Sequence, residues 1–158
     1  MNAQNLFLVN SLNGVFDENG NFYFSVVYEG DVVSKMPLEG KHPIGVYFDN
    51  YLIGLNEPPF CMTHDAAMQF CAKLNYQGKI ATPGGRDFWM KLVQCGKDIV
   101  DRLNRLFVHL GGQALKFDER YWVVGKKSKR AWTCNMKNHD FYRYLSEGLF
   151  WTRPVVSL

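Results

Sequence analysis

Residues 99–112 read IVDRLNRLFVHLGG, and this stretch decides the fold class of the chain. Its apolar residues recur at every third or fourth position, so a helix gathers them into one stripe: Ile99, Val100, Leu103, Leu106, Phe107 and Leu110. Gly111 and Gly112 follow at once, and glycine commonly ends a helix. The sequence therefore predicts a helix with one buried face that ends at Gly111.

Two further helices are predicted before this one. Thr63 is a suitable N-cap for the first, and Asp65 in its first turn suits the helix dipole. The apolar face of this helix holds Ala67, Phe70, Cys71 and Leu74. The second helix opens after the glycines of Thr82-Pro83-Gly84-Gly85, and its apolar residues are Phe88, Trp89, Leu92 and Val93.

Both flanks of the helical region are predicted to form β-structure, because they are rich in aromatic and β-branched residues. The strands expected before the helices cover residues 22–28, 31–33, 44–48 and 51–55. Those expected after the helices cover residues 121–124, 130–134, 141–144 and 150–158, and the last strand is expected to pair near the first. This order predicts an α+β fold with a largely antiparallel sheet and two to three helices inserted in the middle of the chain.

Composition narrows the class of protein further. The chain has 158 residues, of which 47% are hydrophobic and 15% aromatic, so it can bury a core and is not intrinsically disordered. No apolar stretch is long enough to span a membrane, and residues 1–10 do not read as a signal peptide. The net charge of +3 is too small to imply nucleic acid. Cys61, Cys71, Cys95 and Cys134 form no C-x-x-C pair and are expected to be free, buried thiols.

A series of short motifs runs from about Lys41 to Leu158. They are HPIGVYF (42–48), THDAAMQFC (63–71), GKIAT (78–82) with DFW (87–89), VDRLN (100–104), YW (121–122), AW (131–132) and RPVV (153–156). In this order they resemble a bacterial branch of the C-type-lectin-like fold, the DUF1566-type domains and their relatives in Bacteroides and their phages. Lys79-Ile80 depart from the family's Arg-Leu, and residues 123–126 replace a polar Ser-Ser-Thr-Glu. The resemblance implies a C-type-lectin-like domain over residues 41–158 and an N-terminal β-hairpin extension, residues 1–40, that serves assembly.

The resemblance also implies a ligand face between two late strands, a region that retroelements diversify in some members of the family. Here that region is polar and aromatic, like an antibody paratope. The candidate ligand-binding residues are Asn135, Lys137, Asn138, His139, Asp140, Tyr142 and Tyr144. The alternative is that this stretch is simply a wide turn between two strands.

The resemblance and the candidate ligand face predict two alternative functions, both non-catalytic. The first is a binding module of a phage virion that presents this loop to a protein or glycan of the host cell surface. The second is a structural capsid or tail subunit that contacts other virion proteins and oligomerises. Phage origin comes from the family analogy and the missing signal peptide, and the bacterial cytoplasm or cell surface is the alternative location. No cofactor, metal or nucleic acid is expected.

Catalytic and metal-binding alternatives find less support in the residues. Formylglycine-generating enzymes share the broad fold, but their paired reactive thiols have only Cys134 as a counterpart here. Calcium-dependent lectins need converging oxygen ligands, and Asn56-Glu57-Pro58-Pro59 is only superficially similar to their motifs. Cys61, His64 and Cys71 lack a fourth zinc ligand, and His64 is expected to face solvent. The run from Lys126 to Arg130 is expected to be a solvated hairpin tip, with phosphate contact as the alternative.

Overall fold

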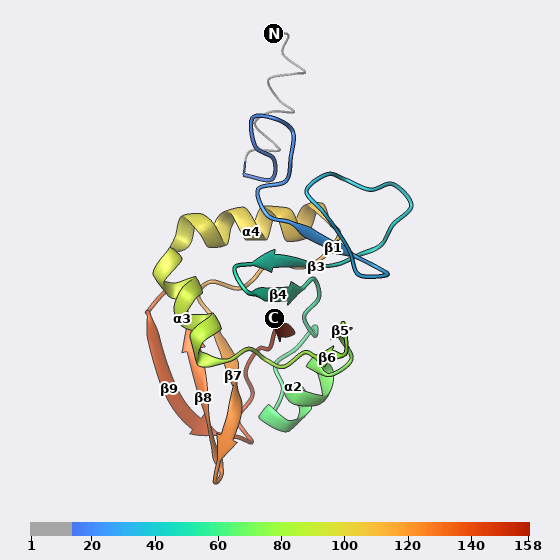
Figure 1. Ribbon diagram of the computed structural model, residues 1–158. Coiled ribbons are helices and arrows are strands. Elements are labelled where there is room, and N and C mark those ends of the chain that lie inside the picture. The colour runs from blue at the N-terminus through green and yellow to red at the C-terminus, as the bar shows by residue number, and fades with distance from the viewer. Residues whose placement is uncertain (1–13) are drawn as a thin grey trace.

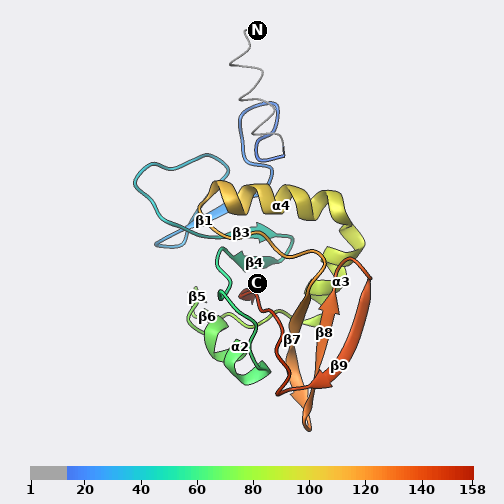
Figure 2. The ribbon, with the colours of Figure 1, turned by 180° about the vertical axis from the view of Figure 1, so that it is seen from behind.

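A computed structural model describes residues 14–158, which form a five-stranded sheet, a three-stranded sheet, a two-stranded ribbon and three helices. The larger sheet has five strands in the order β10-β4-β3-β1-β2. Its strands are β1 (Val26–Tyr28), β2 (Val32–Ser34), β3 (Pro43–Phe48), β4 (Tyr51–Gly54) and β10 (Val155–Ser157). The long helix α4 (Lys97–His109) lies along this sheet (Figures 1 and 2).

The smaller sheet lies away from α4 and has three strands in the order β7-β8-β9 (Figure 1). These are β7 (Arg120–Lys127), β8 (Arg130–Asn135) and β9 (Asp140–Leu145). A two-stranded ribbon, β5 (Asn75–Tyr76) and β6 (Lys79–Ile80), follows α2 (His64–Cys71), which packs against β7. Every strand pair within residues 14–158 is antiparallel, so the α+β fold class is confirmed.

The helix boundaries agree with the chemistry of the residues at their ends. The hydroxyl oxygen of Thr63 accepts a hydrogen bond from the backbone N–H of Ala66 and caps α2. Helix α3 (Arg86–Cys95) starts after Gly85 and stops at Gly96, whose φ of +83° favours glycine. That glycine separates α3 from α4 and lets the two helices point in different directions (Figure 2).

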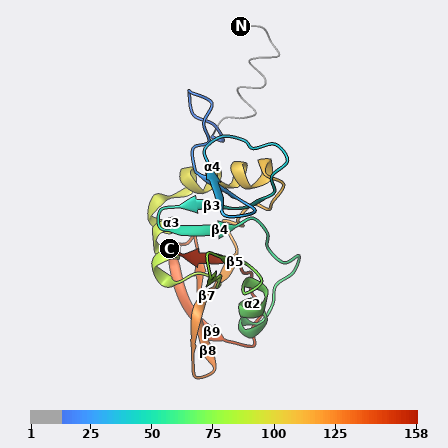
Figure 3. The same ribbon diagram turned by 45° about the vertical axis from the view of Figure 1, so that its right-hand side comes forward.

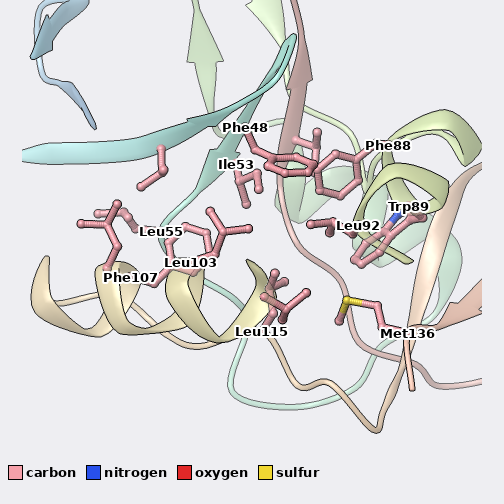
Figure 4. Close-up of a cluster of buried hydrophobic side chains, with 14 of the residues drawn as sticks. Phe48, Ile53, Leu55, Phe88, Trp89, Leu92, Leu103, Phe107, Leu115 and Met136 are labelled. Carbon is pink, nitrogen blue, oxygen red and sulfur yellow. The ribbon is translucent and has the colours of Figure 1, made fainter. Parts of the chain in front are cut away.

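One core joins α3 and α4 to the larger sheet and to β7. Figure 4 shows side chains of α3, α4 and the strands converging in it: Phe48, Ile53, Leu55, Phe88, Trp89, Leu92, Leu103, Phe107, Leu115 and Met136. The stripe of α4 predicted from the sequence is buried at Val100, Leu103, Leu106 and Phe107. Burial of this stripe, rather than helix propensity, accounts for most of the stability of α4.

The expectation about the last strand needs correction, and part of the expected N-terminal extension lies outside the described residues. The last strand, β10, covers only Val155–Ser157 and pairs with β4 rather than near the first strand (Figure 3). Phe150 and Trp151 make only single bridges, to Met62 and Tyr121. Residues 1–13 of the expected N-terminal extension lie outside the described residues.

The rest of the expected extension shares the main core. β1 pairs with β3 as well as with β2, and Val26 and Tyr28 belong to the same buried cluster as Phe107. The division at residue 40 therefore does not separate two cores within residues 14–158. No helix in this part of the chain is long and apolar enough to cross a membrane.

Candidate functional site

The sheet β7-β8-β9 has two faces, and the cross-strand register assigns each side chain to one of them. Tyr142 lies opposite Thr133 and Tyr144 opposite Ala131, so both tyrosines are on one face. We call Arg120, Asp140, Tyr142 and Tyr144 the tyrosine face. The register places Trp132 opposite Arg143 and Arg130 opposite Leu145 on the other side. We call Arg86, Lys127, Arg130, Trp132 and Arg143 the arginine face.

A single guanidinium organises the tyrosine face. The Cζ atom of Arg120 lies 5.1 Å from the ring centre of Tyr142 and 5.5 Å from that of Tyr144. Nη2 of Arg120 lies 2.8 Å from a carboxylate oxygen of Asp140, and Nη1 donates to the hydroxyl of Thr133. Tyr142 remains 55% exposed and Tyr144 37% exposed. The face therefore combines accessible aromatic area with a restrained position, which lowers the entropy cost of binding.

The structure distributes the seven predicted ligand-binding residues over different environments. Tyr142 and Tyr144 lie on the outer strand, and Asp140 is half-buried at its start. Lys137, Asn138 and His139 are exposed in the turn that joins β8 to β9. Figure 2 shows this turn and β9 at the rim of the molecule.

The predicted exposure of Asn135 is wrong. Asn135 is only 6% exposed, and its side-chain oxygen accepts a hydrogen bond from the backbone N–H of Asn138 at 3.0 Å. The next residue, Met136, is fully buried in the core. Asn135 therefore shapes the turn, because an asparagine side chain can replace a backbone group in closing it. The accessible surface consists of the turn tip and β9, not one continuous loop.

Cations and one indole ring make up the arginine face. The Cζ atoms of Arg86 and Arg143 lie 5.0 and 5.2 Å from the Trp132 ring centre. Arg86 also lies 5.1 Å from the ring of Phe141. Lys127 is placed directly opposite Arg130 on the neighbouring strand. Sequence analysis missed Arg86 and Arg120 because both are distant in sequence from residues 135–144 and no local pattern marks them.

A buried ionic cluster supports β7 from inside. The carboxylate of Glu57 is fully buried, accepts a hydrogen bond from the hydroxyl of Tyr121, and lies 3.4 Å from Nη1 of Arg153 and 3.3 Å from Nζ of Lys116. Arg153 also donates to the backbone carbonyls of Gly54 and Leu55. Burial, reinforced by the Glu57 carboxylate, raises the pKa of Tyr121 well above its ordinary value. The cluster joins four segments and acts as a scaffold for the sheet.

The predicted solvent exposure of His64 is wrong. His64 is 3% exposed, its Nε2 lies 3.3 Å from the carbonyl oxygen of Val123, and its ring meets Trp122 edge-on. Burial is the main reason that its pKa is lowered. Within residues 14–158, no group of three His, Cys, Asp or Glu side chains is placed to hold a metal ion. His64 thus packs between α2 and β7.

The thiols are free, as expected, but only Cys71 and Cys134 are buried. Burial raises the pKa of both thiols to about 12. Cys61 is half-buried and Cys95 is exposed, so the expectation that all four are buried is wrong. At neutral pH the two buried thiols are protonated and are therefore poor nucleophiles and metal ligands.

The basic run forms the turn between β7 and β8, so the expectation of a hairpin tip is confirmed. Lys126 makes an exposed ion pair with Asp65 of α2 at 3.4 Å. A hollow of about 510 Å³ lies beside this turn and is lined by both of these residues, Lys129 and Leu145 among others. It is open and mixed in polarity, so it extends the accessible surface at the end of β9.

Comparisons with known proteins add no family to this picture. No family model matches the sequence, and neither a curated protein nor a solved structure matches it significantly.

Proposed function

We propose that this protein is a non-catalytic binding module whose tyrosine face contacts a protein or glycan partner. The observation that carries the proposal is the pair of accessible rings, Tyr142 and Tyr144, both in contact with the guanidinium of Arg120. Tyrosine and arginine are enriched at the centres of binding surfaces: tyrosine supplies large contact area with only two rotatable bonds, and arginine supplies several hydrogen-bond donors in a planar group. The protonated state of Cys71 and Cys134 also supports a non-catalytic role.

The resemblance to C-type-lectin-like domains supplies the biological setting of the proposal. In that setting the protein is a component of a phage virion, and the partner belongs to the host cell surface. The antiparallel α+β architecture, with its helices in the middle of the chain, is compatible with the fold that this resemblance implies.

The test is a binding screen of the full chain against an array of bacterial surface polysaccharides and a yeast-displayed peptide library. A Tyr142→Ala, Tyr144→Ala double variant is expected to lose at least about tenfold in affinity for the selected binders, as for other aromatic hot spots. The matched control is Tyr23→Ala, because Tyr23 is 41% exposed and also stacks on an arginine, Arg102. Unchanged binding by the double variant, or equal loss in the control, would contradict the proposal.

A second candidate, a subunit for particle assembly, is favoured by a different surface. β2 is the edge strand of the larger sheet, and three apolar side chains in and after it are exposed: Val32, Val33 and Met36. Deleting residues 1–40 would also remove buried Val26 and Val27, so a point substitution is the cleaner test. We expect Val33→Asp to turn an oligomer into a monomer in sedimentation experiments if assembly uses this edge. A wild-type chain that is already monomeric would contradict this candidate.

A further inference from the structure

β9 is the edge strand of the sheet β7-β8-β9, and no strand of residues 14–158 pairs with its outer side. Figures 1 and 2 both show β9 on the outside of the molecule. In an antiparallel ladder, alternate residues direct their backbone groups toward and away from the neighbouring strand. Ser146 N–H donates to the carbonyl oxygen of Lys129 at 2.8 Å. Continuing this alternation, Tyr142 and Tyr144 face β8, while Phe141 and Arg143 direct their backbone groups outward.

The edge of β9 lacks most of the devices that prevent strand addition. Proteins block such edges with proline, bulges, very short strands, a covering segment or charged side chains, and β9 carries the charged residues Asp140 and Arg143. β9 has six residues, no proline, and an unbroken register with β8 over all six. Four of the six are aromatic or aliphatic, namely Phe141, Tyr142, Tyr144 and Leu145. A strand with these properties is a template for another strand.

The sheet around this edge is strongly basic. Residues 120–145 contain seven basic residues and one acidic residue, Asp140, which gives +6 against +3 for the whole chain. The acid is already paired with Arg120. No carboxylate within residues 14–158 lies within ion-pair distance of Arg86, Lys127, Arg130 or Arg143. Lys127 and Arg130 lie directly opposite each other, an arrangement that costs free energy until an anion relieves it.

We propose that β9 binds an extended, acidic segment of a partner protein as an added strand. This inference rests on the proposed function and names the chemistry of the partner. Side chains of an added strand alternate between the two faces, so residues opposite Arg143 meet the arginine face and their neighbours meet Tyr142 and Tyr144. The segment therefore alternates acidic with apolar residues. A second copy of this chain does not fit, because it would bring Arg143 and the basic hairpin against like charges.

The experiment uses the full chain and a labelled heptapeptide in which valine and glutamate alternate, followed by fluorescence anisotropy. We expect the peptide to bind and the same peptide with lysine in place of glutamate not to bind. Arg143→Glu is expected to weaken binding by about tenfold or more, since it exchanges a charge-assisted contact for a repulsion. Lys35→Glu, an equal charge change on an exposed residue beyond β2, is the matched control and is expected to have no effect.

Two reagents separate strand addition from simple charge attraction. Methylation of the alternate backbone nitrogens of the peptide keeps its charge but removes the donors that an added strand needs, so binding is expected to be lost. Arg143→Pro removes both the guanidinium and an outward-facing N–H without breaking the ladder to β8, whereas Arg143→Gln removes the guanidinium alone. We therefore expect Arg143→Pro to weaken binding well beyond Arg143→Gln while the fold is retained. Should Arg143→Pro fail to fold, the methylated peptide and Arg143→Glu still decide the question.

Several results would overturn the inference. They are absence of peptide binding, equal binding of the methylated peptide, tight binding of an acidic polysaccharide that Arg143→Pro leaves unchanged, and self-association that Arg143→Pro abolishes. The proposed function has its own criterion, the loss of selected binders in the Tyr142→Ala, Tyr144→Ala variant. If those binders are lost while the peptide does not bind, the function stands and only the acidic strand partner is rejected.

Discussion

β7 and β9 belong to one three-stranded sheet and both are rich in aromatic residues, but they have opposite environments. Tyr121 and Trp122 of β7 are fully buried, whereas Tyr142 and Tyr144 of β9 are exposed. Elements cover β7 from both sides: the ring of Trp89 lies 5.0 Å from Tyr121, and Phe150 lies 5.0 Å from Trp122. On β9 the tyrosines meet chiefly Arg120 and, for Tyr144, Phe150. Aromatic strands become core or binding surface according to what packs on them.

The largest effect that separates the two strands is expected at the ionic cluster behind β7. Arg153→Met removes the buried guanidinium next to Glu57 and its hydrogen bonds to the carbonyls of Gly54 and Leu55, of which Leu55 keeps the N–H of Gln113 as a donor. Breaking one side of a buried ion pair costs about 3–5 kcal/mol, so we expect a loss of unfolding free energy in that range. Urea denaturation measures it. A loss below about 1 kcal/mol would mean that the cluster does not support β7.

A smaller effect is expected at Trp122 itself. Its indole N–H donates to the carbonyl oxygen of Met62 at 2.7 Å and so connects β7 to the segment before α2. Trp122→Phe keeps an aromatic ring but removes this hydrogen bond, so the Met62 carbonyl keeps only the N–H of Phe150 as a donor, and the smaller ring leaves part of the indole volume empty. Together these losses cost about 1–3 kcal/mol. The measurement is the Tm of Trp122→Phe compared with the Tm of Tyr142→Phe, which changes an aromatic residue on the exposed strand β9. Equal stability of the two variants would contradict the burial of β7.

The pH dependence of stability is expected to come partly from His64, which packs on the covered side of β7. Burial lowers its pKa below the ordinary value of 6.5. The unfolded state therefore binds more protons as the pH falls below 6.5, and stability is lost in that direction. We expect His64→Gln to reduce the difference in Tm between about pH 7.5 and pH 5. His42→Gln, at an exposed position, is the control, and an identical change in both would contradict the assignment.

The smallest effect is expected on β9. The Tyr142→Ala, Tyr144→Ala variant removes exposed rings, and surface substitutions of this kind change stability by less than about 1 kcal/mol in total. Calorimetry of this variant beside Trp122→Phe makes the comparison. A fall in Tm as large as that of Trp122→Phe would show that the tyrosines belong to the core, and the proposed binding surface would be lost with it.

Most of the fold could be predicted because local patterns encode it. The stripe of α4, the cap at Thr63 and the glycine at the α3–α4 junction all act within a few residues. Predicted strand boundaries were less accurate at 22–28 and 150–158, where only short segments pair. Whether a residue with high β-propensity joins a ladder depends on a partner strand that is distant in sequence.

The candidate site was only partly predictable. Exposed tyrosines of β9 and the turn at Asn138 lie where the sequence placed them. Asn135 and His64 were predicted to face solvent because polar residues are usually exposed. Both are instead buried and hydrogen-bonded, Asn135 to the backbone of Asn138 in the turn and His64 to the carbonyl of Val123 in β7. Arg120, Arg86 and Glu57 could not be recognised as members of these sites, because their partners lie on other elements.

Periodicity and turn chemistry act over short distances, so the residues alone predicted the order of the main strands and helices and the antiparallel character of the sheets. Folding in three dimensions covers β7 and leaves β9 as an open edge beside Arg130 and Arg143, with which no carboxylate of residues 14–158 forms an ion pair. This difference depends on how α2, α3 and the C-terminal segment pack on the two faces of the sheet at β7. This packing depends on many contacts between residues far apart in the chain, so no local sequence pattern predicts it.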